Sequence, residues 1–395
     1  MDILEMFGIF AGQFNCILMK HLYLVTCLVA IALPSRLQAE TLLFERFYNE
    51  VSLDSSLTPE WSPPANLGTF DIVINAGTTL AANAPALAAF NRAAAQWEAF
   101  IADSITITID ADMGALGAST IGSTSSTAYV YAYDTLRDAL VADAVNEADD
   151  GIVASLPTSA QFSSTLDGGI DVGGGNSVTW NGNLSATAAN LKALGIVVPD
   201  VADATITFNT SFSFDFDNSD GVTTGSVDFE TVAAHEIGHA LGWTSNIDTI
   251  DSLMNTSTAG SVSIRTMDLF RFEDGTANDP SNAAQFTTAQ RAQTPGTTMI
   301  FDEVTLSGSI SGGEALLSTG RTQGDGQQAS HLKDSLGLGL MDPTLADEEV
   351  VSISTTDLRV LDLIGYEILS PIPEPSASIL LLSGFSLLLL QRKRS

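Results

Sequence analysis

The sequence predicts an α+β fold, and three patterns carry this prediction. Residues 105–109 alternate isoleucine with threonine, which is typical of a half-buried strand. Residues 85–101 place apolar side chains at three- and four-residue spacing, which indicates an amphipathic helix. Residues 228–242 are predicted to form a second helix, because Asp228 is a suitable N-cap, an apolar stripe follows it, and Gly242 is a suitable stop.

The composition is strongly acidic, with 47 Asp and Glu against 15 Lys and Arg and a formal net charge of −32. An acidic surface repels nucleic acid and anionic membrane surfaces, so neither is an expected partner. We interpret the charge as serving solubility or salt tolerance. Both cysteines, Cys16 and Cys27, precede the predicted processing site, so the mature body would contain neither a disulfide nor a thiolate metal ligand.

Residues 1–39 are predicted to be a leader that contains a secretory signal. The run that begins at Met19 supplies a positive start, and residues 22–33 supply an apolar core. Ala39 ends a suitable cleavage site. We therefore expect translation to start at Met19 and the mature chain to be exported after cleavage behind Ala39.

Four further elements are expected along the body of the chain. Residues 70–75 are predicted to form a strand, and residues 205–217 alternate apolar with polar side chains, as one long strand or two short strands would. Residues 135–148 and 357–364 are predicted to be helical. The rest of the region 111–199 carries no pattern with recognisable chemistry.

The chemistry is concentrated in the run His235-Glu236-Ile237-Gly238-His239. On a helix, two histidines four residues apart stand on the same face, so both imidazoles can bind one Zn²⁺. Glu236 then stands beside the metal, where it can act as a general base toward water. The alternative is a buried helix with incidental histidines, but the cap, the apolar backing and the glycine stop favour a zinc site.

A catalytic zinc site needs a third protein ligand, and two candidates remain in the sequence. His331 is the favoured candidate, because it is the one histidine of the mature body that lies outside the helix. Asp248 is the less favoured candidate. Alternatively, Asp248 stabilises a turn or orients one of the metal ligands without binding the metal itself.

Several features together resemble the leishmanolysin-like metzincins, and more closely a group of bacterial PEP-CTERM zinc metalloproteases. The resemblance covers residues 228–248 and 327–366. Its motifs are the HExxHxxG helix, a distant Ser330-His331, a turn at Met341-Asp342-Pro343 and a terminal helix that ends in Ile364-Gly365-Tyr366. The chain departs from the family in its missing cysteine framework and at Leu332, where relatives commonly carry tryptophan.

The resemblance implies a two-lobed zincin fold. Residues 40–242 would form an N-terminal lobe with a twisted mixed sheet, a backing helix and the active-site helix. Residues 243–370 would form a mostly irregular C-terminal lobe with a terminal helix. The resemblance further implies that residues 205–217 supply the edge strand that holds the substrate backbone. The implied roles are zinc ligands for His235, His239 and His331, general base for Glu236, and a turn beneath the metal for Met341.

The tail at residues 371–395 resembles a PEP-CTERM sorting signal. It begins with Pro373-Glu374-Pro375, continues with a short apolar run, and ends in Arg392-Lys393-Arg394. The resemblance implies recognition by an exosortase in the envelope of a Gram-negative bacterium, and a final location at the cell surface or in the extracellular matrix. The alternative is a simple membrane anchor, for which the apolar run is short.

Residues 215–221 alternate acids before a glycine and so resemble a calcium loop. Their register does not match the EF-hand pattern, and an Asx-rich turn is the favoured interpretation. Calcium is therefore the alternative, and one Zn²⁺ is the cofactor we expect.

The function favoured by the sequence is that of an exported zinc-dependent endopeptidase. One alternative is a catalytically silent matrix or adhesion protein on the same scaffold. A silent protein has no need of the Glu236 carboxylate, which favours the enzyme. A second alternative is a zinc amidase that acts on cell-wall peptides.

Overall fold

The computed structural model describes residues 43–51, 69–147, 150–302 and 315–369. Contacts divide the chain into Met1–Thr41 and Leu42–Ser395, and everything described lies in the second unit. The predicted leader and sorting tail therefore lie outside the described residues. Among the helices that are described, none is both long enough and apolar enough to span a membrane.

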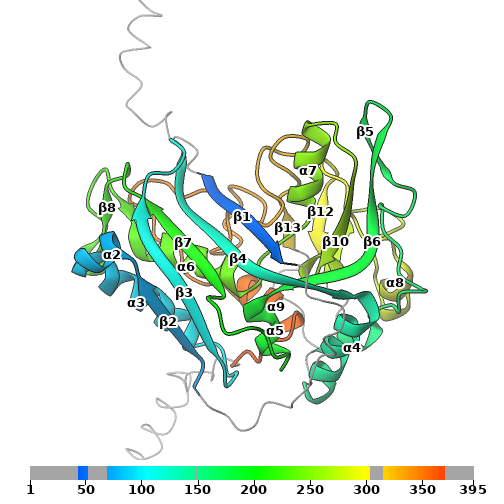
Figure 1. Cartoon of the computed structure of the whole chain (residues 1–395), viewed down its shortest axis with the longest axis horizontal. Coiled ribbons are helices and arrows are strands. Elements are labelled where there is room, and N and C mark those ends of the chain that lie inside the picture. The colour runs from blue at the N-terminus through cyan, green and yellow to red at the C-terminus, as the bar shows by residue number, and fades with distance from the viewer. Residues whose placement is uncertain (1–42, 52–68, 148–149, 303–314, 370–395) are drawn as a thin grey trace, which may run out of the picture. The chain divides into compact units, whose positions relative to one another are not determined.

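The described part has an α+β fold, as the sequence predicts, and its main sheet is mixed. The strand order is β10-β6-β4-β7-β3-β2, with β1 beside β4 and β5 beside β6 (Figure 1). β2 and β7 are parallel to β3, whereas β4 is antiparallel to β7 and β6. The strands are β1 (Leu43–Val51), β2 (Asp71–Ala76), β3 (Thr106–Gly114), β4 (Thr120–Ala132), β5 (Ile170–Gly173), β6 (Asn176–Thr187), β7 (Ala204–Asn209) and β10 (Gly260–Arg265).

The predicted alternation of residues 105–109 is confirmed in β3, where Ile107 and Ile109 are fully buried while Thr106 is exposed. The predicted helix at 85–101 is α3 (Ala84–Glu98), whose N-terminus is capped by the side chain of Asn83. The buried stripe of α3 packs against α6 (Phe229–Leu241), the helix that carries the histidine pair.

The remaining helices are shorter. They are α2 (Thr78–Ala82), α4 (Tyr133–Asp143), α5 (Ala188–Ala193), α7 (Ile247–Asn255), α8 (Ala283–Thr288) and α9 (Thr355–Leu363), with 3₁₀ turns η1 (Ala144–Asn146), η2 (Val153–Ser155), η3 (Asn218–Asp220) and η4 (Met267–Phe270). Two small sheets pair β8 (Phe214–Asp215) with β9 (Val227–Asp228), and β11 (Arg271–Glu273) with β12 (Met299–Phe301) and β13 (Ala315–Leu317). The predicted helices 135–148 and 357–364 thus correspond to α4 with η1 and to α9.

The expectation that residues 205–217 form an edge strand is wrong. This stretch contains β7 and the short β8, and β7 is hydrogen-bonded to β3 on one side and to β4 on the other. A strand with two neighbours has no free edge with which to hold another peptide. β4 packs against α6, and the sequence does not predict this strand because its serine-rich and threonine-rich stretch resembles a loop.

Candidate metal centre

Local sequence signals define where helix α6 begins and where it ends. At its N-terminus, Asp228 accepts a hydrogen bond from the backbone N–H of Thr231 at 2.9 Å. At its C-terminus, Gly242 adopts a φ of 143°, a conformation that favours glycine. A Cβ at this position would also lie 2.8 Å from Cδ1 of Ile364. Gly242 therefore allows the chain to turn sharply away from the helix while remaining close to the end of α9.

His235, His239 and His331 converge in the fold. His235 and His239 come from α6, and His331 comes from a loop far along the chain. The three Nε2 atoms lie 3.1 Å (235 to 239), 3.2 Å (235 to 331) and 3.1 Å (239 to 331) apart. All three side chains are fully buried. This cluster can hold a metal ion.

The hydrogen bonds of the outer ring nitrogens fix the tautomers. Each Nδ1 faces a backbone carbonyl: His235 that of Leu340 at 2.9 Å, His239 that of Trp243 at 2.8 Å, and His331 that of Gln328 at 3.1 Å. A carbonyl oxygen only accepts, so each Nδ1 must carry the proton. In the neutral rings, each Nε2 then presents a lone pair toward the other two.

Three lone pairs this close repel one another unless a cation lies between them. Burial, reinforced by the positive charge that a protonated His331 would carry, lowers the pKa of His235 well below its ordinary value. The cluster therefore favours neutral rings, which are the form that binds metal. Three nitrogens at the usual Zn–N distance lie about 3.3 Å apart in tetrahedral geometry, so the observed spacing fits a zinc-sized ion.

Met341 lies directly against α6. It is fully buried, and a Cβ on Gly238 would come within 2.5 Å of its Sδ atom. Glycine at this position therefore lets the turn approach the helix between the two histidines. The backbone carbonyl of Met341 also accepts a hydrogen bond from the N–H of Leu332 at 2.9 Å, which connects the turn to the residue after His331.

Glu236 is fully buried and faces β4. Its Oε2 accepts a hydrogen bond from Oγ1 of Thr124 at 2.5 Å, and a Cβ on Gly122 would lie 2.5 Å from its Oε1. Two residues further along β4, the hydroxyl of Ser126 donates to the carbonyl of His239 at 3.0 Å. The backbone of β4 therefore runs beside both the carboxylate and the histidine pair. No pattern in the sequence singled out Thr124.

Asp248 lies behind the third histidine and outside the three-histidine cluster. Its carboxylate accepts hydrogen bonds from the N–H of Ala329, at 2.6 Å, and from the hydroxyl of Ser330. The Ser330 hydroxyl in turn accepts from the N–H of Ser245 at 3.1 Å. Asp248 thus connects the segment after α6 to the two residues that precede His331. This is the orienting role that was the alternative to metal binding for this residue.

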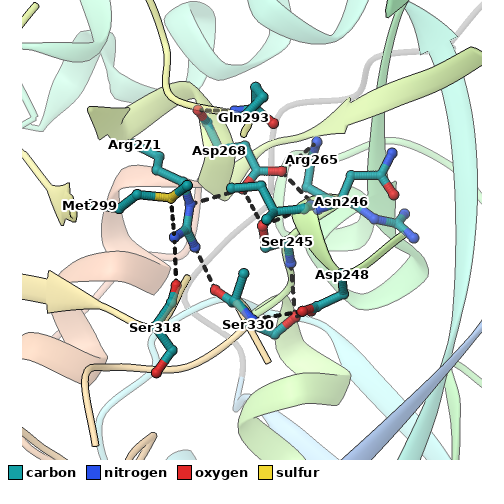
Figure 2. Close-up of polar contacts among 12 residues, drawn as sticks. Ser245, Asn246, Asp248, Arg265, Asp268, Arg271, Gln293, Met299, Ser318 and Ser330 are labelled. Carbon is teal, nitrogen blue, oxygen red and sulfur yellow. Dashed lines mark hydrogen bonds and ion pairs between the residues drawn. The ribbon is translucent and has the colours of Figure 1, made fainter. Parts of the chain in front are cut away.

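A buried ion pair between Asp268 and Arg271 extends this network (Figure 2). Asp268 accepts from the Ser245 hydroxyl at 2.7 Å and from the Asn246 N–H at 2.9 Å. Arg271 donates to the carbonyl of Ala329 at 2.6 Å and to that of Ser318 at 3.2 Å. These bonds fix the His331 loop against the segment that leaves α6, and no sequence pattern predicted them.

Two groups of acidic residues lie outside the histidine cluster. In the acidic loop at residues 215–221, the Asp215 carboxylate accepts from the N–H of Asp217 at 2.9 Å, which is an Asx-type turn, and also from the N–H and hydroxyl of Thr223 at 2.7 and 2.6 Å. The second group contains Glu147, Asp150 and Asp362, whose oxygens lie within 4.8 Å of one another. Arg359 donates to both Asp150 and Asp362 and so neutralises part of this charge.

Comparison of the chain with protein-family models, with curated proteins and with solved structures gives no match. A function for this protein must therefore be argued from the geometry of the three-histidine centre and from the sequence.

Proposed function

We propose that the three-histidine centre holds one Zn²⁺ and that the protein is an exported zinc-dependent endopeptidase. The observation that carries this proposal is the convergence of three Nε2 atoms within 3.1–3.2 Å, beside the buried carboxylate of Glu236 on the same helix. Nitrogen donors alone suit several transition metals. The adjacent glutamate favours zinc, because the His-Glu-x-x-His arrangement combines two ligands with a base.

Each residue of the centre has a role in hydrolysis. The three histidines bind as neutral rings, and their Nδ1–H groups keep the rings oriented by donating to backbone carbonyls. When bound, Zn²⁺ supplies the Lewis acidity that activates water and polarises a scissile carbonyl. Glu236 receives the proton from the attacking water and later passes it to the leaving amine. Thr124 holds the Glu236 carboxylate through its Oε2.

We also propose that the chain is a two-lobed zincin of the metzincin class, divided near residue 242. Support comes from the sharp end of α6 at Gly242, from the distant third histidine, and from the buried Met341 against Gly238. In this proposal the mixed sheet, α3 and α6 belong to the first lobe. The His331 loop, the Met341 turn and α9 belong to the second.

Export and sorting are proposed from the sequence of the terminal segments. The signal at residues 19–39 would direct secretion, and the tail at 371–395 would be recognised by an exosortase. The enzyme would then act on protein or peptide substrates at the surface, or in the matrix, of a Gram-negative cell.

The test is hydrolysis of casein and of a fluorogenic peptide library by the zinc-loaded protein, beside Glu236→Gln. We expect activity that a chelator abolishes and zinc restores. The variant should keep its zinc and lose at least about a hundredfold in rate, since it lacks the base. A variant as active as the wild type would contradict the assignment of Glu236. Zinc binding without any peptide hydrolysis would support the silent scaffold instead, and cleavage of peptidoglycan fragments alone would support the amidase.

A further inference from the structure

The edge of β4 that faces away from β7 is shared by β6, which pairs at residues 128–132, and by β1, from the beginning of the described chain (Figure 1). β1 runs parallel to β4, and its register extends from Leu43 opposite Thr120 to Val51 opposite Tyr129. Residues Gly122–Ser126 of β4 are paired with β7 on one edge. A strand has two edges, so β1 must lie along the other.

This pairing lies directly beside the metal centre. In the register, Arg46 is opposite Thr124, whose hydroxyl bonds Glu236, and Tyr48 is opposite Ser126, whose hydroxyl bonds the carbonyl of His239. The backbone of β1 therefore runs past the section of β4 that contacts the base and one of the histidines.

The centre is closed to solvent with β1 in this position. His235, Glu236, His239 and His331 all have 0% exposure. A site that hydrolyses polypeptides must admit an extended chain, and such a chain binds most readily by pairing with a strand edge. The edge of β4 next to Glu236 could pair with a substrate in this way, and β1 occupies it.

We propose that β1 is an inhibitory strand of this same chain, which occupies the peptide-binding edge of β4 and must leave before a polypeptide substrate can enter. The proposal rests on the endopeptidase function proposed above. A tethered segment competes at an effective concentration in the millimolar range, so it excludes most substrates present at micromolar levels. β1 is joined to β2 through residues 52–68, and a single cut in that segment would separate it from the catalytic body. Proteolysis between β1 and β2 would therefore activate the enzyme.

Two neighbouring proline substitutions in the full chain test the pairing. The N–H groups of successive strand residues point to opposite sides, so one of Arg46→Pro and Phe47→Pro removes an N–H directed at β4 while the other removes one directed away. The two variants are matched controls for each other. Both are loaded with zinc, and two rates are measured beside the wild type: release of zinc to a chelator, and hydrolysis of a fluorogenic peptide.

We expect one variant of the pair to be faster than the wild type in both measurements by about tenfold, the effect of one lost hydrogen bond, and the other to resemble the wild type. Adding a synthetic peptide with the sequence of residues 43–51 should slow the fast variant again, whereas a scrambled peptide should not. Equal rates of zinc release in the two variants, whether slow or fast, would overturn the inhibitory strand.

The two readouts separate this inference from the proposed function. Zinc release reports on the accessibility of the centre whether or not the protein is a peptidase. If one variant releases zinc faster and no form of the protein hydrolyses peptides, the covering strand stands and the endopeptidase function fails. If the wild type and both variants hydrolyse peptides at one rate, the function stands and the inhibitory strand fails.

Discussion

The carboxylate of Asp357 accepts a hydrogen bond from the backbone N–H of Met341 at 3.0 Å, and a second from Leu340 at 2.7 Å. The carbonyl of Leu340 then accepts from Nδ1 of His235. A fully buried side chain in the first turn of α9 thus supports the turn beneath the centre and, through it, the orientation of a histidine. Burial raises the pKa of Asp357, and the hydrogen bonds it accepts oppose that effect.

We predict that Asp357→Asn weakens zinc binding by about tenfold to a hundredfold, which is the usual effect of losing a group that orients a metal ligand. The amide nitrogen would meet an N–H group where an acceptor is needed. Ser354→Ala is the matched control, because it removes the cap that bonds the Asp357 N–H and leaves the bonds to the turn in place. Competition titration with a zinc chelator measures both. Equal affinity losses in the two variants would mean that helix capping, and not the turn, is responsible.

Asp248 is predicted to orient the third ligand without binding the metal. Asp248→Asn should lower zinc affinity by about tenfold to a hundredfold and leave the number of nitrogen ligands unchanged. Asp251→Asn on the same helix is a suitable control, because Asp251 holds Thr322 and Gln323 instead of the residues before His331. Loss of a ligand from the zinc absorption spectrum of Asp248→Asn would show that Asp248 binds the metal directly.

Removing Arg271 should destabilise the fold strongly. Arg271→Met leaves the Asp268 carboxylate buried without its ion-pair partner, for which the usual loss is about 3–5 kcal/mol of unfolding free energy. The double variant with Asp268→Asn should lose less than the sum of the two single variants, since it leaves no uncompensated charge. Denaturant unfolding of the four proteins measures this coupling. Additive losses would indicate that the two side chains stabilise the fold independently.

The acidic cluster around Asp143 should make the protein less stable at higher pH. Burial and the nearby carboxylates of Asp103, Glu367, Asp150 and Asp362 raise the pKa of Asp143 to about 8. The pKa of a carboxyl group in the unfolded chain is about 4. At pH values between this pKa and the raised pKa of Asp143, the folded state therefore binds more protons than the unfolded state. The contribution to stability is therefore complete at pH about 4 and is lost as the pH rises through about 8.

It follows that Asp143→Asn should raise the melting temperature at pH about 8.5 and change it little at pH about 4, where the wild-type group is already protonated. Asp138→Asn, on the exposed side of the same helix, is the control. Thermal unfolding at the two pH values checks this. If Asp143→Asn raised the melting temperature equally at both pH values, the charge of Asp143 would not be the cause of the stabilisation.

The sequence predicted the secondary structure best where one physical signal dominates. The isoleucine–threonine alternation of β3, the apolar stripe of α3 and the capped, glycine-terminated α6 needed only local rules. Spacing on one helix was also enough to bring His235 and His239 together. The edge position expected for residues 205–217 rests on the family resemblance alone, because alternation shows which residues face the core but not which strands are neighbours.

The residues that the sequence patterns did not reveal act through long-range contacts. Thr124 meets Glu236 because β4 lies over α6, and Arg271 meets Ala329 because a distant loop folds back on it. Neither pairing leaves a local pattern. Asp357 does belong to a local pattern, because Ser354 and Asp357 have the spacing of a capping box. This spacing indicates where a helix starts, but it does not predict a contact with the turn at Met341.

The most direct test of the metal centre is the zinc X-ray absorption spectrum of the zinc-loaded protein beside His331→Ala. We predict three imidazole nitrogens at about 2.0–2.1 Å in the wild type, and two in the variant. A variant spectrum identical to that of the wild type would contradict the three-histidine centre, because the third ligand would then have to come from elsewhere in the chain.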